Sequence, residues 1–314
     1  MNRAAAVSTT APRDEVLRRL ELIVTRRLDG LLLGDHLGLV PGHGSDLGET
    51  RVYQPGDDVR RIDWNVTART RVPHVRETIV DRELETWVLV DLSASLDFGT
   101  AACEKRDLAL AAAATVGFLT ARGGNRIGAV LLDSTGATTT VPARAGRAHL
   151  LGLLQRVATA PRADGTGSTD LGPGIARLAA TMPRRGLAVV VSDFLSRGPW
   201  DRPLRRLGMR HEVLCVEVVD PRELALPSVG IVELIDPETG SVREVHTGAA
   251  GLRARYAAAA ADQRSSIARA VRGAGADQLQ LRTDRDWLGD LVRFVSWRRR
   301  RWHHSAVSTA RARR

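Results

Sequence analysis

Short apolar runs alternate with longer helical patterns from residue 86 to residue 300, and this alternation restricts the fold more than any other feature. The expected strands are Trp87–Asp91, Arg126–Leu132, Leu187–Asp193, Val213–Val219 and Gln278–Thr283. The expected helices lie near residues 104–122, 147–159, 171–182, 199–208, 251–273 and 286–300. Parallel strands need helical crossovers, which cover both faces of their sheet. The pattern therefore predicts an α/β fold with a doubly wound, mostly parallel sheet.

Two segments interrupt this alternation. Thr138–Pro142 follows the second expected strand closely enough to pair with it as an antiparallel partner. Val229–Asp236 and Ser241–His246 are joined by a short turn and predict a β-hairpin insertion.

The composition favours a globular protein with an aliphatic core. Hydrophobic residues make up 43% of 314 residues, and aromatic residues only 4%. The two cysteines, Cys103 and Cys215, lie in apolar segments and are expected to be reduced. The longest alanine- and leucine-rich stretch, Leu108–Ala121, is shorter than the ~20 residues that cross a bilayer. Because Met1–Pro12 also lacks the apolar core of a signal peptide, we expect a cytoplasmic protein without a membrane span.

Four regions follow from these patterns. We expect a disordered leader at 1–12, a helix with a loop and strand extension at 13–84, the α/β domain at 85–300, and a basic tail at 301–314. Seven arginines and no acidic residue lie from Arg298 to Arg314. Such a tail allows a peripheral contact with an anionic surface, but a solvated terminus is the more common outcome. A nucleic-acid partner is therefore not expected.

Oxygen-bearing side chains follow two of the expected strands. Asp91, Ser93 and Ser95 come at the end of the first, Asp193 ends the third, and Thr169 precedes a helix between them. The carboxyl ends of parallel strands meet at one edge, where α/β sheets bind ligands. Carboxylate and hydroxyl oxygens suit Mg²⁺, or another divalent cation such as Mn²⁺ or Ca²⁺. The alternative is structural, because the same residue types cap helices and bind loop amides.

This set resembles the metal-ion-dependent adhesion site of von Willebrand factor A domains, in which Asp-x-Ser-x-Ser is followed by Thr and then Asp. The resemblance implies that Ser93, Ser95 and Thr169 bind the metal through hydroxyls, and Asp91 and Asp193 directly or through water. An acidic residue of a partner would complete the coordination. Many such domains have Thr-Asp-Gly in the third loop, whereas this chain has Ser-Asp-Phe at 192–194.

A second resemblance rests on a longer signature, RVYQPGDDVRRIDW at residues 51–64, followed by Thr67-Ala68-Arg69 and by the sequence RELE at 82–85. It is similar to the signature of the bacterial "domain of unknown function 58" family. The resemblance implies a von Willebrand factor A-like, Rossmann-type domain, commonly encoded beside a MoxR-type AAA+ ATPase, which is therefore the expected partner.

The charges of this signature have two interpretations. The aspartates can pair with neighbouring arginines and pin the extension to the sheet, which is the interpretation that we favour. Dense arginine with a tryptophan is also typical of interfaces, so the alternative is a partner-docking surface. The residues concerned are Arg51, Tyr53, Asp57, Asp58, Arg60, Arg61, Asp63, Trp64 and Arg69.

Together these features predict a non-enzymatic protein-interaction module that uses a metal site to engage its partner. The alternative is a metal-dependent phosphoester hydrolase with the same site, in which Asp91 acts as base or nucleophile. That alternative lacks an acid/base partner, because phosphatases of the haloacid dehalogenase type need a second Asp where this chain has Ser93.

Overall fold

The computed structural model describes residues 21–22, 50–54, 58–76, 85–122, 124–162, 169–196, 198–236 and 239–298. The expected leader, the basic tail and most of the expected N-terminal helix lie outside these residues. Within that helix, residues 21–22 are helical.

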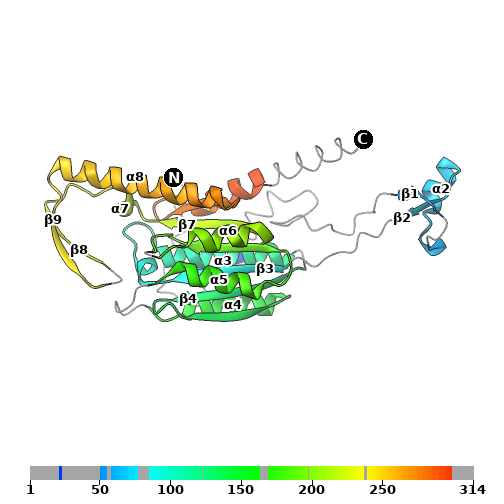
Figure 1. Cartoon of the computed structure of the whole chain (residues 1–314), viewed down its shortest axis with the longest axis horizontal. Helices are drawn as coiled ribbons and strands as arrows, with labels where there is room; N and C mark the ends of the chain where they lie inside the picture. Colours follow the sequence, from blue (N-terminus) through cyan, green and yellow to red (C-terminus); the bar gives the residue numbers. More distant parts are fainter. Residues whose placement is uncertain are drawn as a thin grey trace.

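A six-stranded sheet forms the centre of the protein (Figure 1). Its order is β10-β7-β6-β3-β4-β5, in which all neighbours are parallel except β4 and β5, which are antiparallel. The strands are β3 (Glu85–Leu92), β4 (Arg126–Asp133), β5 (Thr138–Arg144), β6 (Leu187–Ser192), β7 (Glu212–Val219) and β10 (Asp277–Arg282). The predicted doubly wound sheet and its antiparallel edge strand are confirmed.

The chain changes direction across the sheet between β3 and β6. It first builds outward from β3 to β4 and β5, and then crosses over to place β6, β7 and β10 on the other side. Open α/β sheets commonly bind ligands at the carboxyl ends of the strands beside such a switch point. β3 and β6 end in the predicted site residues, so the topology places that site at the switch point.

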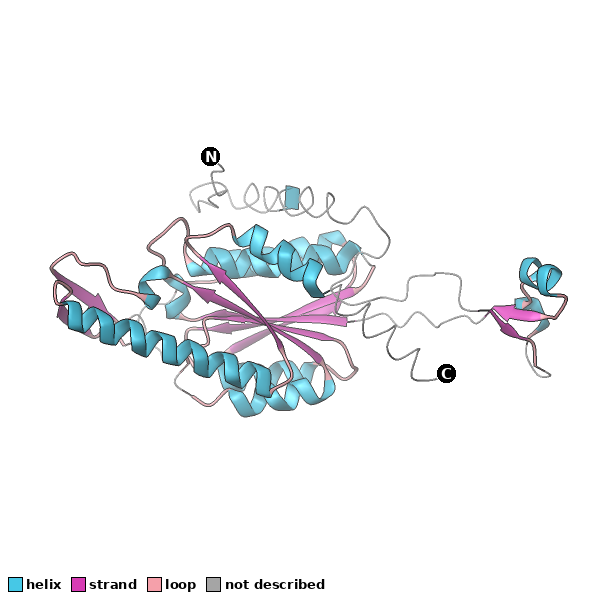
Figure 2. Ribbon diagram, turned by 90° about the horizontal axis from the view of Figure 1, so that it is seen from above, coloured by secondary structure: helices cyan, strands magenta, loops and turns pink. Residues whose placement is uncertain are grey.

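Helices cover both faces of the sheet (Figure 2). One face is covered by α3 (Lys105–Arg122), α4 (Arg147–Thr159) and a helical segment at 287–298. The other is covered by α5 (Leu171–Thr181), α6 (Asp201–Arg210) and the last turns of α8 (Ala250–Gly273). Alternate residues of β3 serve the two cores, with Val88 and Val90 on one side and Trp87 and Leu89 on the other.

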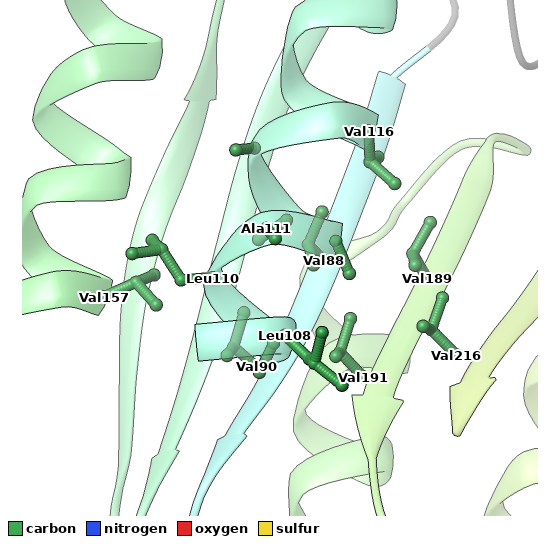
Figure 3. Close-up of a cluster of buried hydrophobic side chains, with 14 of the residues drawn as sticks. Val88, Val90, Leu108, Leu110, Ala111, Val116, Val157, Val189, Val191 and Val216 are labelled. Atoms are coloured by element: carbon green, nitrogen blue, oxygen red, sulfur yellow. The ribbon is translucent and has the colours of Figure 1, made fainter. Parts of the chain in front are cut away.

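Helix α3 lies over the middle of the sheet. Figure 3 shows Leu108 of this helix beside Val90 of β3 and Val191 of β6, and Ala111 beside Val88 of β3. The side chains at residues 105–120 are all buried, and most are alanine, leucine or valine. A helix that is apolar around its circumference is stable only inside a protein. α3 is therefore the central element of the fold. Its first residue, Lys105, lies close to the switch point.

A β-hairpin and the start of α8 extend beyond the sheet (Figures 1 and 2). The hairpin consists of β8 (Ile231–Ile235) and β9 (Val242–His246), as predicted. Helix α8 follows it and has 24 residues, of which only Ile267 and Val271 are buried. Its last turns therefore attach this arm to the sheet.

The N-terminal extension forms small local elements. β1 (Thr50–Val52) pairs with β2 (His74–Arg76) in an antiparallel sheet, with η1 (Val59–Arg61) and α2 (Trp64–Thr70) between them. Two further short helices, η2 (Ala94–Asp97) and α7 (Pro221–Leu224), were not expected from periodicity because each is about one turn long. No helix in the part of the chain that the structure describes is long and apolar enough to cross a membrane.

The contact between α6 and the end of α8 depends on a glycine. A Cβ atom at Gly208 of α6 would overlap the backbone carbonyl oxygen of Ala274. We expect Gly208→Ala to lower the free energy of unfolding by about 1–3 kcal/mol, because a backbone atom cannot rotate away as a side chain can. Urea denaturation monitored by circular dichroism measures this loss.

Gly152→Ala in α4 is the matched control, because nothing lies within 4 Å of its added Cβ. This variant should be neutral or up to about 1 kcal/mol more stable, as alanine is the better helix former. Equal effects of the two substitutions would contradict the proposed close packing.

Candidate functional site

The candidate site lies where β3 and β6 end, on either side of the switch point. Asp91 is the second-last residue of β3, and Ser93 follows the end of that strand directly. Ser95 lies in η2, and Asp193 is the first residue after β6. Both strands are runs of buried aliphatic residues paired in register, which aligns their carboxyl ends. The structure therefore brings four of the five predicted metal ligands together.

Asp91 is held by neutral donors. Its Oδ1 accepts a hydrogen bond from the Ser93 backbone N–H at 2.9 Å, and its Oδ2 accepts one from the Ser192 hydroxyl at 2.6 Å. The side chain is only 4% exposed. Burial and the nearby Asp193 carboxylate raise the pKa of Asp91 to about 6. The described hydrogen bonds of this carboxylate therefore include no cation.

The two serine hydroxyls lie next to each other. Ser93 Oγ and Ser95 Oγ are 3.1 Å apart. Adjacent ligands of an octahedral ion bonded at about 2.1 Å are about 3 Å apart. The separation of the hydroxyl pair therefore fits a hard divalent cation. The donor chemistry of the pair and of the Asp91 carboxylate fits such a cation as well.

Asp193 is bound to a buried lysine. Lys105, the first residue of α3, donates from Nζ to Asp193 Oδ2 at 2.7 Å and also to Glu223 Oε1 in α7. Asp193 Oδ1 accepts from the Leu195 backbone N–H at 3.0 Å. Burial alone would raise the pKa of Asp193, but the Lys105 ammonium lowers it below its ordinary value. Asp193 is thus ionised and paired, whereas Asp91 is hydrogen-bonded only to neutral groups among the described contacts.

A second cation, Arg264, lies next to the Lys105 ion pairs and shares the Glu223 carboxylate with Lys105. Arg264 of α8 donates to the backbone carbonyl of Asp193 at 3.1 Å, to Glu217 Oε1 at 2.8 Å and to Glu223 Oε2 at 3.4 Å. The pKa of Lys105 is raised above its ordinary value, because its two carboxylate partners outweigh the effect of burial. The end of α8 is therefore connected to the candidate site through charged groups.

The Thr169 hydroxyl is bonded to the end of β4 in this structure. It donates to the backbone carbonyls of Ser134 at 3.2 Å and Asp133 at 3.4 Å, in the turn between β4 and β5. The interpretation of Thr169 as a metal ligand thus stays a prediction. Asp193 as a ligand also stays a prediction, with one of its oxygens occupied by Lys105.

The loop after β6 explains the departure from Thr-Asp-Gly. Phe194 has a φ of 58°, in the left-handed region that favours glycine. Its ring is buried and packs against Trp200, with centroids 5.1 Å apart. The apolar burial of this ring offsets the backbone strain, so a phenylalanine keeps the loop shape that a glycine adopts without cost.

Two aspartates of the signature act as helix caps. Asp58 accepts from the Arg60 N–H at 3.0 Å, and Asp63 accepts from the N–H groups of Asn65 at 3.0 Å and Val66 at 3.2 Å. Trp64 is 70% exposed. Asp57 and the side chains of Arg51 and Arg61 lie outside the described residues, so both the ion-pairing and the docking interpretations stay predictions. Tyr53 is half-buried, and Arg69 Nε donates to the Asn65 carbonyl at 3.4 Å.

Sequence reasoning missed the charged groups that surround the site. Lys105, Glu223 and Arg264 lie far from Asp193 in the sequence, and only Lys105 had a signal, because it is the single lysine among 46 basic residues. In the described ranges no cluster of three or more His, Cys, Asp or Glu side chains could hold a metal ion. A cation at this site would therefore depend on the serine hydroxyls.

The comparisons with known proteins agree with the fold and the signature. The model of the family described as "Protein of unknown function DUF58" matches residues 49–266. The chain belongs to this family. The predicted membership is therefore confirmed, and the sheet order confirms the predicted α/β arrangement with a mostly parallel sheet.

Similar curated proteins carry no assigned function. An uncharacterized protein of Mycobacterium tuberculosis is 58% identical over 284 residues, which are 90% of this chain and 89% of the relative. An uncharacterized protein of Mycobacterium avium is 51% identical over 162 residues, which are 52% of this chain and 95% of the relative.

Several solved structures are more distantly similar. An aerotolerance-related membrane protein from Bacteroides fragilis has a TM-score of 0.44 and 12% identity, covering 66% of this chain and 94% of that chain. BatB from Bacteroides thetaiotaomicron has a TM-score of 0.42 and 13% identity, with coverages of 69% and 99%. A von Willebrand factor type A structure from Catenulispora acidiphila has a TM-score of 0.34 and 18% identity, with coverages of 47% and 35%.

Asp220 joins three loops beside the site, and its pH dependence provides a test of the structure. Its carboxylate accepts from the Thr100 N–H at 2.8 Å and hydroxyl at 2.6 Å, from the Thr283 hydroxyl at 2.8 Å and from the Arg222 N–H at 2.9 Å. Although burial opposes it, these donors lower the pKa of Asp220. A carboxyl group whose pKa is lowered by folding stabilises the fold at pH values above its ordinary pKa of about 3.9. This stabilisation is lost as the pH falls through the lower pKa that the group has in the folded protein.

We expect Asp220→Asn to lower the free energy of unfolding at pH 7 by about 1–3 kcal/mol, because its amide group turns a donor toward other donors. The difference from wild type should shrink as the pH falls below about 4. Chemical denaturation at pH 7, 5 and 3 measures it. A difference that stays constant over this range would contradict the assigned hydrogen bonds.

Proposed function

We propose that this protein is a non-enzymatic protein-interaction module that uses a divalent cation at the switch point to engage an acidic residue of a partner. Asp91, Ser93 and Ser95 would hold the cation, which is Mg²⁺ or a similar ion such as Mn²⁺ or Ca²⁺. The observation that carries the proposal is the 3.1 Å hydroxyl pair beside the Asp91 carboxylate. When bound, the ion would supply an open coordination position to a carboxylate of the partner.

The arrangement of Asp91 favours binding over hydrolysis. Both of its oxygens accept hydrogen bonds from groups of the loops at β3 and β6, which fix its orientation. Each carboxylate oxygen keeps a further lone pair that a cation can use. The hydrolase alternative has less support, because the described hydrogen bonds of Asp91 come from Ser93 and Ser192 and include no acid/base partner.

The partner that we propose is a MoxR-type AAA+ ATPase, within the assembly or remodelling of other complexes. Its support is membership of the family, which carries the signature at residues 51–64. The same signature offers a second contact surface, since the side chains of Trp64, Arg60 and Arg69 are all exposed. Tryptophan and arginine residues often contribute most of the binding energy at protein interfaces.

Removal of the cation tests the metal site. With Mg²⁺ at one hundred times its dissociation constant, wild type should gain about 2.7 kcal/mol over the protein in EDTA. Asp91→Asn and Ser93→Ala should lose this gain, because the first removes the negative charge of the site and the second removes a hydroxyl ligand, while Ser241→Ala in the exposed turn of the hairpin should keep it. Thermal denaturation of the four proteins measures the effect. Equal responses of all four proteins to Mg²⁺ would place the ion elsewhere.

Substitution of Trp64 tests the docking surface. We expect Trp64→Ala to weaken binding to the purified MoxR-type ATPase of the same cell by about tenfold or more, without loss of stability because the side chain is exposed. Met209→Ala, at an exposed position of α6, is the matched control and should bind as wild type does.

Calorimetry with and without Mg²⁺ and nucleotide provides the measurement. Equal binding by wild type and Trp64→Ala would exclude Trp64 as a contact. No binding by wild type under any of these conditions would exclude this partner.

A further inference from the structure

The only lysine of the chain is placed inside the candidate metal site. The other 45 basic residues are arginines. Lys105 is 1% exposed, and its Nζ contacts one carboxylate on each of two loops, Asp193 after β6 and Glu223 in α7. Phe98 covers a further side of the ammonium, with Nζ 5.9 Å from the ring centroid. A compact ammonium fits this enclosure, whereas a planar guanidinium needs more room and a fixed fork of acceptors.

The charges around Lys105 divide the site into two halves. In one half Lys105 and Arg264 are paired with Asp193, Glu217 and Glu223. In the other half Asp91 binds only neutral donors among its described contacts. With all six groups ionised, four carboxylates face two cations, and a net charge of −2 remains. A divalent ion would balance this charge, and Asp91 is the carboxylate with a charge left to neutralise.

We propose that the Lys105 ammonium is a built-in cation of the site, which keeps Asp193 out of the coordination shell and lowers the affinity for a divalent ion. Asp193 is then a positioning residue that anchors Lys105, while Asp91, Ser93 and Ser95 are the metal ligands. This inference rests on the proposed function for the existence of a bound ion.

Asp193 could either anchor Lys105 or bind the metal ion, and these two roles predict opposite results for a double variant that keeps the net charge unchanged. The double variant Lys105→Met/Asp193→Asn removes one positive and one negative charge together and leaves the net charge unchanged. If Asp193 only anchors Lys105, Mg²⁺ binding should stay close to that of wild type. If Asp193 is a ligand, Mg²⁺ binding should be lost. Neutral replacement of both partners of a buried ion pair usually preserves folding.

The single variant Lys105→Met tests the effect on affinity. Loss of one positive charge beside a divalent ion should tighten Mg²⁺ binding about tenfold or more, since the interaction takes place at low effective dielectric. Arg162→Met, which removes an exposed cation that pairs with Glu104, is the matched control and should bind Mg²⁺ as wild type does. If Lys105→Met does not fold, the double variant alone decides the question.

Isothermal titration with MgCl₂ at pH 7 provides the measurement, with Asp91→Asn included and circular dichroism to confirm folding. The inference holds if the double variant binds as wild type does and Lys105→Met binds more tightly. It is overturned, with the proposed metal site intact, if Mg²⁺ binds wild type but not the folded double variant, or binds Lys105→Met no more tightly.

Two further outcomes separate the inference from the proposed function. Binding by Lys105→Met but not by wild type would show that the lysine replaces the ion, which supports the inference and removes the metal from the proposed function. Absence of binding in every folded variant would overturn both.

Discussion

The buried ion pair between Lys105 and Asp193 is the interaction on which the arrangement of this protein depends. A charge buried without a partner costs several kcal/mol, so each group must meet the other in the folded chain. Their contact fixes the start of α3 against the end of β6. Glu223 and Arg264 then attach α7 and α8 to the same point. The group that orients the candidate site is thus also the group that joins four elements of the fold.

The same ion pair makes the two strands at the switch point electrostatically different. β3 and β6 present one carboxylate each, but the two differ in electrostatic environment because a lysine faces only one of them. An asymmetric pair can keep one member as a scaffold and leave the other for a ligand. Paired carboxylates with separated pKa values are a general way of giving two similar groups different tasks.

Sequence periodicity predicted the sheet well because its determinants are local. The valine-rich runs at β3, β6 and β7 and the turn between β8 and β9 each contain their own signal. The sequence also predicted the sheet edge at which Asp91, Ser93, Ser95 and Asp193 meet, because this edge depends only on the direction of the strands. The partners of Asp193 could not be predicted, because Lys105 and Glu223 lie 88 residues before it and 30 after it, and pairing across such separations leaves no periodic trace. The hydroxyl of Thr169 illustrates the same limit, because its acceptors in the β4–β5 turn are set by loop packing.

The arm formed by the hairpin and α8 has a consequence for the dynamics of the protein. Helix α8 is about 36 Å long, yet no residue before Ile267 in it is buried. In the hairpin, Glu233 lies directly opposite Glu244, a like-charge pair that weakens strand pairing. Segments with so few buried contacts open independently of the core at low free energy. We therefore expect the hairpin and the part of α8 before Arg264 to behave as a separate cooperative unit, whose amide hydrogens exchange with solvent while those of β3 and β6 remain protected.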